Sequence, residues 1–390
     1  MVQPRKMDSD VLGGSPPRSD AGSSAPAKRA GARDAGAASS QRVAAYDLGS
    51  NSFRLLVAEP DGQGGLVELA RGHDEVCLGE HALRDGVIPF PTFQRGLDGL
   101  IGLRRIADGF APEHTIAVAT SAIREARNGP DFVHAVAREV GLAVEVLDPV
   151  KEATLIYWGA RRSLEAGRRF ALFDVGGGSI KAVVGDSLQC RFATSLPMGF
   201  WRLRDQCAHD QLNHHPALLT AETRVRAVVQ PAVRQMLKLG FDFVTFTSSL
   251  ALALAQLAQG DGERMADPRG RSGEGMGRHL LLSLARLRAL EARLSTTPPG
   301  TRPTSLGDMI RTDTILPGTL LLRTLLELTG QDSALVCESA LSEGLVVDYF
   351  VRHEAGKSGN KTGKTGLTGK TGLTGLTGKT GKTGKTGLTG

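Results

Sequence analysis

The chain has 390 residues, of which 41% are hydrophobic and 23% charged, a composition typical of a globular protein. No run reaches the roughly 18 apolar residues that a membrane-spanning helix needs, so the sequence predicts no membrane partner. The net charge of +6 comes from the two ends of the chain. It therefore does not indicate a domain that binds a specific nucleic acid.

Residues 1–40 are rich in Ala, Gly, Ser, Pro and Arg and have no periodic apolar face. This composition predicts a disordered N-terminal extension. No apolar core follows the early Arg and Lys, so the segment is not typical of a signal peptide.

A hairpin motif occurs twice, as VAAYDLGSNSFRLLVA in residues 43–58 and as FALFDVGGGSIKAVV in residues 170–184. Each copy is an apolar run, then Asp-x-Gly-x-x-Ser, then a second apolar run, which predicts two strands joined by a glycine-containing turn. Asp47 and Asp174 are 127 residues apart, about the length of one small domain. This spacing predicts two similar domains that face each other, each presenting one phosphate-sized loop.

One such turn by itself is more typical of a plain hairpin, but two matched copies favour a binding function. Glycines let a ligand approach the main chain, and successive N–H groups in such a turn form an anion-binding nest. Asp47 and Asp174 suit a phosphate site only if a cation such as Mg²⁺ (or Mn²⁺) lies between them and the ligand. The predicted substrate-binding residues are Gly49, Ser50, Asn51, Ser52, Gly176, Gly177, Gly178 and Ser179.

Between the two hairpins, Thr115 to Ala119 (TIAVA) reads as a buried strand. Thr120 and Ser121 then stand where a helix cap belongs, which places Arg124 in the first turn of a helix. A helix start with a nearby Arg suits an anion. The alternative is that Arg124 simply pairs with Glu125 or another surface acid.

Four blocks together resemble the exopolyphosphatase / guanosine-pentaphosphate phosphatase (Ppx/GppA) family of the acetate kinase–hsp70–actin superfamily. They are DLGSNSFRLLV from Asp47, AVATSAIREARN from Ala117, DVGGGS from Asp174, and IRTDTILPG from Ile310 with the later ALSEGLVVDY. The similarity runs from about Val43 to Tyr349. It implies an α/β fold of two actin-like (ribonuclease H-like) domains with a cleft between them. The expected limits are 41–163 for the first domain and 168–356 for the second, which includes a closing C-terminal helix.

The resemblance also implies roles for individual residues. Residues 145–157 read EVLDPVKEATLIY, and Glu152 falls on the position of the family's catalytic base. It would activate a water that attacks the terminal phosphorus, while Mg²⁺ neutralises charge on the transferred group. Without the resemblance, Glu152 would be an ordinary carboxylate at a helix start. The implied catalytic residues are Glu152, Arg124 and Asp174, and the implied metal ligands are Asp47, Asp174 and Glu152.

The chain departs from the family pattern at three places. Lys151 replaces the first Glu of an acidic pair, and Ile180 and Lys181 replace a hydroxyl donor and a carboxylate. The glycines of a later family loop are missing from residues 245–250, TFTSSL. Two readings follow: the site uses Lys151 and Lys181 to grip a polyanion with altered metal dependence, or it has lost hydrolysis and only binds.

The predicted function is a metal-dependent phosphohydrolase that removes terminal phosphate from inorganic polyphosphate or guanosine pentaphosphate. The alternatives are a catalytically weakened sensor that binds (p)ppGpp or polyphosphate, and a kinase of the same superfamily. Four scattered cysteines without a C-x-x-C pair indicate reduced thiols and a cytoplasmic location. A homodimer is left open.

The chain ends in ten consecutive Lys-Thr-Gly or Leu-Thr-Gly triplets, residues 361–390. A P-loop is excluded there, because a period of three never places glycines five apart. We expect residues 357–390, with seven lysines and no acid, to form a disordered, solvated tail.

Overall fold

The computed structural model describes residues 41–62, 65–164, 166–207, 215–259, 280–302, 312–338 and 341–359. The expectations for residues 1–40 and 360–390 lie outside these ranges. Helix α11 (Leu341–Gly359) continues past residue 356, where we expected the second domain to end, because helix ends are weakly marked in sequence. No helix within the described ranges is long and apolar enough to cross a membrane. The four cysteines, all inside these ranges, form no disulfide with one another.

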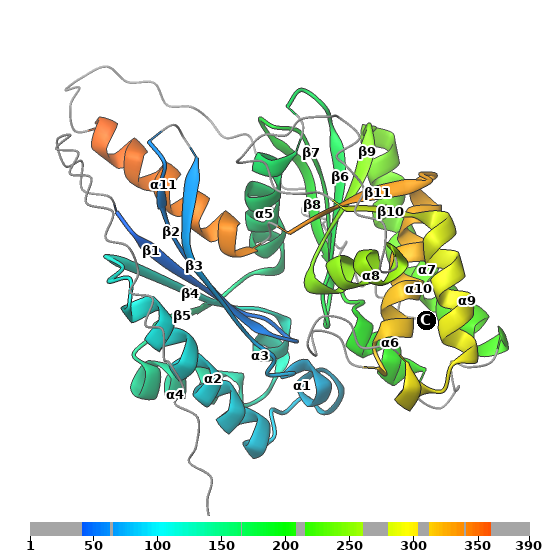
Figure 1. The fold of residues 1–390 in the computed structure, drawn as a ribbon, viewed down its shortest axis with the longest axis horizontal. Helices are drawn as coiled ribbons and strands as arrows, with labels where there is room; N and C mark the ends of the chain where they lie inside the picture. The colour runs from blue at the N-terminus through cyan, green and yellow to red at the C-terminus, as the bar shows by residue number, and fades with distance from the viewer. Residues whose placement is uncertain are drawn as a thin grey trace, which may run out of the picture. The chain divides into compact units, whose positions relative to one another are not determined.

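The first sheet contains the first hairpin motif at its centre (Figure 1). Its strand order is β3-β2-β1-β4-β5, with β1, β2 and β3 antiparallel and β4 and β5 parallel to β1. The strands are β1 (Val43–Leu48), β2 (Phe53–Pro60), β3 (Leu66–Asp74), β4 (His114–Ala119) and β5 (Val144–Val146).

The second sheet repeats this order as β8-β7-β6-β9-β11, and β10 adds one antiparallel strand at the edge. The predicted α/β class with two actin-like units is therefore confirmed, and the sequence repeat is the centre of a duplicated sheet. The strands are β6 (Phe170–Val175), β7 (Ile180–Gly185), β8 (Cys190–Leu196), β9 (Phe243–Thr247), β10 (Leu280–Ser283) and β11 (Ser333–Cys337).

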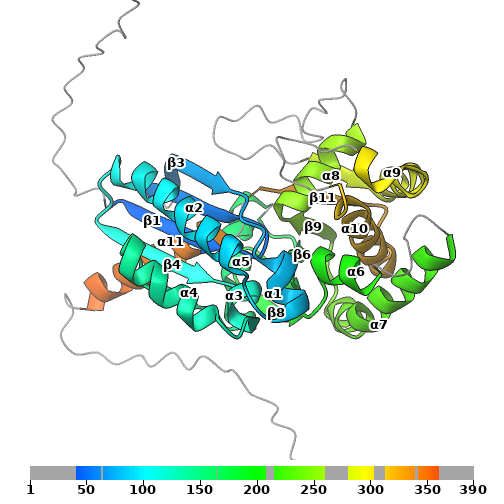
Figure 2. The same ribbon diagram turned by 90° about the horizontal axis from the view of Figure 1, so that it is seen from below.

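Helices cover both faces of the first sheet (Figure 1 and Figure 2). Helix α2 packs on β2 and β3 from one side, and α11 packs on β1 and β2 from the other. The helices are α1 (Gly79–Asp85), α2 (Phe90–Asp108), α3 (Ser121–Glu125), α4 (Gly129–Ala135) with a π-helical turn (Val136–Val140), α5 (Pro149–Ala160), α6 (Phe200–Gln206), α7 (His215–Leu239), α8 (Ser249–Gln259), α9 (Leu284–Thr296), α10 (Ile315–Thr329) and α11, with 3₁₀ turns at Arg161–Ser163 and Pro299–Thr301.

Helix α5 connects the two sheets, because it packs on β7 and β8 as well as on α11. Gly344 permits the close approach of α11, since a Cβ there would lie 1.9 Å from the carbonyl oxygen of Leu155. Apolar side chains of α5, α11, β1 and β6 form one shared core cluster. The C-terminal helix therefore packs back on the first sheet, although most of its neighbours in sequence belong to the second.

The alternation of side chains along the strands decides which residues face this shared core. In β1, Ala44, Tyr46 and Leu48 pack toward α2, whereas Val43 and Ala45 pack toward α5 and α11. In β6, Phe170 and Leu172 join the same shared cluster. Since side chains alternate with a period of two, Asp47 and Asp174 fall on the shared faces of both sheets.

Candidate active site

The two turns of the repeated motif have the same backbone hydrogen bond. The Gly49 N–H donates to the Ser52 carbonyl at 3.1 Å, and the Gly176 N–H donates to the Ser179 carbonyl at 3.0 Å. Directly opposite each aspartate in the strand ladder stands a base: Arg54 opposite Asp47, and Lys181 opposite Asp174. The period of two places acid and base of each pair on the same face of the sheet.

Both turns line one cavity, together with Asp47, Asp174 and Glu152. The two turns lie close together there. A Cβ on Gly177 would lie 3.4 Å from the Ser50 Cβ and only 2.3 Å from the Trp201 Cδ1, so no side chain fits at that position. All predicted substrate-binding residues line this cavity: Gly49, Ser50, Asn51, Ser52, Gly176, Gly177, Gly178 and Ser179.

Glu152 enters the cavity from the first turn of α5. The side chain of Asp148 caps this helix by accepting hydrogen bonds from the backbone N–H groups of residues 150 and 151. Glu152 is 2% exposed and forms ion pairs with two cations, Arg124 at 3.3 Å and Lys181 in closer contact. A buried carboxylate is stable only with such partners.

Arg124 comes from α3, whose N-cap is Thr120, although the Thr120 side chain makes no capping bond. Its guanidinium donates to the Leu147 carbonyl at 2.9 Å and to Glu152. Glu125, the alternative partner weighed from the sequence, pairs instead with Arg202 of α6. The structure therefore places Arg124 beside the predicted base, where it orients that carboxylate.

Burial raises the pKa of both aspartates. For Asp47 the pKa rises to about 7, chiefly by loss of solvent, with Arg54 opposing the rise and Glu152 adding to it. Asp47 Oδ1 is buried and has no hydrogen-bond partner among the described residues. Asp174 accepts a hydrogen bond from the Thr247 hydroxyl at 2.8 Å, and burial again raises its pKa.

The substituted positions have different environments. Lys181 is 4% exposed and donates to the Ser179 hydroxyl at 2.9 Å in addition to its contact with Glu152. Ile180 packs in the apolar core of the second sheet. Lys151 is partly exposed, pairs with Glu145 at 2.5 Å and does not line the cavity. The expectation that Lys151 grips a ligand in this site is therefore wrong, because neighbouring helix residues point in different directions.

The chain between β9 and α8 also reaches the cavity. Ser248 has a φ of 121°, a conformation that glycine adopts easily and serine rarely, and its hydroxyl accepts a hydrogen bond from the Ala251 N–H. Ser249 accepts a hydrogen bond from Arg54. Of the fourth block, Thr314 lines the cavity, while residues 310 and 311 lie outside the described ranges.

Sequence reasoning missed Arg54, Ser248 and Ser249 as lining residues. The repeat itself contained a signal for Arg54, because Arg54 follows Asp47 at the same distance at which Lys181 follows Asp174. Ser249 could not be found in this way, since its contact with Arg54 joins segments that are far apart in the chain.

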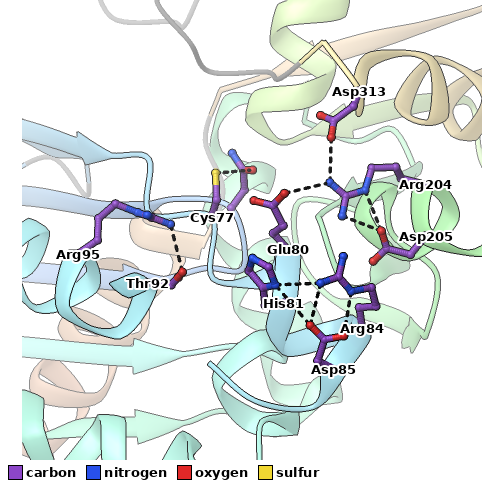
Figure 3. Close-up of polar contacts among 11 residues, drawn as sticks. Cys77, Glu80, His81, Arg84, Asp85, Thr92, Arg95, Arg204, Asp205 and Asp313 are labelled. Carbon is purple, nitrogen blue, oxygen red and sulfur yellow. Dashed lines mark hydrogen bonds and ion pairs between the residues drawn. The ribbon is translucent and has the colours of Figure 1, made fainter. Parts of the chain in front are cut away.

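Two arginines of α6 form ion pairs that join the two sheet units beside the cavity. Arg204 contacts Glu80 of α1 at 3.5 Å and Asp313 at 2.9 Å (Figure 3). It also lies over the Trp201 ring. Arg202 donates to the Gly178 carbonyl and pairs with Glu125. We call the pairs Arg204–Glu80 and Arg202–Glu125 the α6 clasp. Helix α6 follows the hairpin of the second sheet, whereas both acids belong to the first sheet unit, so the pairs connect the two.

Asp47 and Asp174 by themselves are better placed to hold a divalent cation than the predicted set of Asp47, Asp174 and Glu152. The partnerless Oδ1 of Asp47 and the nearby Asp174 provide hard oxygen ligands of the kind that Mg²⁺ and Mn²⁺ prefer. Glu152 is occupied by Arg124 and Lys181. Across the described ranges, no group of three His, Cys, Asp or Glu side chains is arranged to hold one metal ion.

The chain is similar to a known protein family and to several solved structures. The model of the Ppx/GppA phosphatase family matches residues 56–353. A crystal structure of an exopolyphosphatase from Cytophaga hutchinsonii is 25% identical, with a TM-score of 0.69, over 79% of this chain and 98% of that one. A structure of the Aquifex aeolicus PPX-GPPA enzyme is 26% identical, with a TM-score of 0.63, over 79% and 99%.

Among curated proteins, the guanosine-5'-triphosphate,3'-diphosphate pyrophosphatase of Vibrio cholerae is 29% identical over 231 residues. The match includes 57% of this chain and 45% of the relative, so the chain spans less than half the length of this curated relative. The family match begins within β2 and covers the whole second hairpin, α5 and most of α11. The chain therefore belongs to the Ppx/GppA phosphatase family.

Proposed function

We propose that this protein is a divalent-metal-dependent phosphohydrolase that removes the terminal phosphate from inorganic polyphosphate or guanosine pentaphosphate. The observation that carries the proposal is the meeting of Asp47, Asp174 and Glu152 in one cavity with two glycine-containing turns. Acids alone would repel a phosphate chain. Arg54 and Lys181 line the same cavity and supply positive charge for it.

In this proposal, the turns bind the terminal phosphoryl group through backbone N–H groups and the hydroxyls of Ser50, Ser52 and Ser179. Asp47 and Asp174 would hold Mg²⁺ or Mn²⁺, which, when bound, neutralises charge on the transferred group. Glu152 accepts a proton from the attacking water, and the phosphoanhydride bond on the opposite side of the phosphorus breaks. Arg124 holds the Glu152 carboxylate in position from α3.

The two candidate substrates share a terminal phosphoanhydride, and both are suggested by relatives. The Cytophaga hutchinsonii neighbour is named an exopolyphosphatase, and the Vibrio cholerae relatives are named for guanosine pentaphosphate cleavage. The residues above contact only the phosphoryl end in our proposal. They therefore support the reaction type and leave both substrates as candidates.

A phosphate-release assay on the purified full chain tests the proposal. Polyphosphate and guanosine pentaphosphate are each supplied with increasing Mg²⁺ or Mn²⁺, and we expect metal-dependent release of inorganic phosphate from at least one. Absence of release from both, at every metal concentration, would overturn it. Binding of either compound without release would support the sensor alternative.

A further inference from the structure

Lys181 is a cation buried among the carboxylates of the cavity. Its side chain is 4% exposed, its Nζ contacts a Glu152 oxygen, and it donates to the Ser179 hydroxyl at 2.9 Å. It also stands opposite Asp174 in the strand ladder. A lysine stem is flexible and its ammonium is a compact point charge, so it can be displaced by another cation.

The negative charges of the acids in the cavity are already balanced by nearby basic side chains. Three acids and three bases meet in it or contact its lining directly: Asp47, Asp174 and Glu152 against Arg54, Arg124 and Lys181. A divalent cation therefore gains less electrostatic free energy from this neutral group than it would gain from three uncompensated carboxylates. Of the three bases, Lys181 is the one that contacts Glu152 and also stands opposite Asp174.

We propose that Lys181, held in place by Glu152, is an internal cation that opposes a divalent metal ion at the Asp47 and Asp174 carboxylates and so weakens metal binding in this cavity. The inference rests on the proposed function, because that function assigns a metal to this site. A metal ion held by Asp47 and Asp174 would also meet the positive charge of Lys181, which acts on both carboxylates. The ion pair with Glu152 keeps Lys181 inside the cavity, so its charge opposes the metal ion there.

The test measures Mn²⁺ affinity without substrate, by the loss of the free-Mn²⁺ signal in electron paramagnetic resonance. Lys181→Met and Lys181→Gln remove the charge and keep much of the side chain's volume. We expect each to bind Mn²⁺ about tenfold more tightly than the unmodified protein, or tighter still. Lys181→Arg keeps the charge and should bind as weakly as the unmodified protein.

Lys151→Met is the matched control, because it removes a lysine that precedes Glu152 in sequence but lies outside the cavity. Its Mn²⁺ affinity should equal that of the unmodified protein. Circular dichroism establishes that each variant is folded. If Lys181→Met does not fold, Lys181→Gln still decides, since its amide can replace the hydrogen bonds to Glu152 and Ser179.

Equal Mn²⁺ affinity in the unmodified protein and the folded charge-removing variants would overturn the inference. This outcome is distinct from failure of the proposed function, because the measurement involves no turnover. If the variants without Lys181 bind Mn²⁺ more tightly but the unmodified protein releases no phosphate, the effect of Lys181 on metal binding stands. Only the proposed enzymatic function is then overturned.

Discussion

Lys181 lies directly opposite Asp174 in the antiparallel ladder of β6 and β7. The first hairpin repeats this arrangement with Arg54 opposite Asp47. Because side chains alternate along a strand, acid and base of each pair face the shared core with α5. Each hairpin therefore supplies one acid and one base to the cavity. Four consequences of this architecture can be measured.

The carboxylate of Glu152 is the proposed proton acceptor. Glu152→Gln keeps the size of the side chain but removes the base, so we expect kcat for phosphate release to fall by about 10²–10⁴-fold while polyphosphate binding is retained. Steady-state kinetics and a separate binding assay measure the two effects. Glu145→Gln, an exposed carboxylate just before the same helix, is the control and should leave kcat unchanged. A loss of binding equal to the loss of kcat would contradict the assignment.

The burial of Asp47 should cost stability above neutral pH. Its folded-state pKa is about 7, against an ordinary value of 3.8, so the folded chain holds a proton that the unfolded chain releases in this range. The unfolding free energy therefore falls as pH rises from about 4 to 7, and the cost is complete above pH 7.

Asp47→Asn removes this cost. In metal-free buffer at pH 8 we expect it to raise the unfolding free energy by about 1 kcal/mol or more, with the difference shrinking toward pH 4. Urea unfolding at both pH values measures the difference. A variant that is less stable than the unmodified protein at pH 8 would show that the ionised carboxylate is better compensated than its surroundings indicate.

The α6 clasp should hold the two turns together. Glu80→Gln combined with Glu125→Gln removes both acids of the clasp and leaves Arg204 its contact with Asp313. Each lost pair is partly exposed, so we expect a stability loss of only about 0.2–1 kcal/mol per pair.

Hydrogen exchange of residues 49–52 and 176–179 should nevertheless become faster in the double variant, because the turns separate more often. Mass spectrometry of peptides spanning these residues measures the rate. Glu68→Gln, which breaks an ion pair within β3, is the control. Identical exchange in all three proteins would mean that the clasp does not restrain the turns.

Ser248 combines a strained backbone with a helix cap. Ser248→Gly relieves the positive φ and costs only a few tenths of a kcal/mol in capping, so we expect a net gain of about 1 kcal/mol in unfolding free energy. Ser248→Ala keeps the strain and loses the cap, which predicts a loss of about 1 kcal/mol. Chemical denaturation compares the two. Changes of the same sign in both variants would refute this explanation.

Much of the fold could be predicted from local patterns. The two hairpin motifs, the strand predicted at residues 115–119 and the duplicated α/β architecture are signalled by apolar runs and glycine turns, and the structure contains them. The roles of Glu152, Arg124 and the two aspartates stay predictions. Their meeting in or beside one cavity follows from strand alternation together with the position of α5 between the sheets.

By itself, the sequence determined which residues stand at the strand ends and which strand face each occupies, because a period of two and a glycine turn are local properties of the chain. Only the tertiary structure decided that Lys181 pairs with Glu152 and that Arg54 reaches Ser249. These partners come from elements distant in the chain. Which charges meet depends on how α5 and the two sheets pack, and no local pattern records that packing.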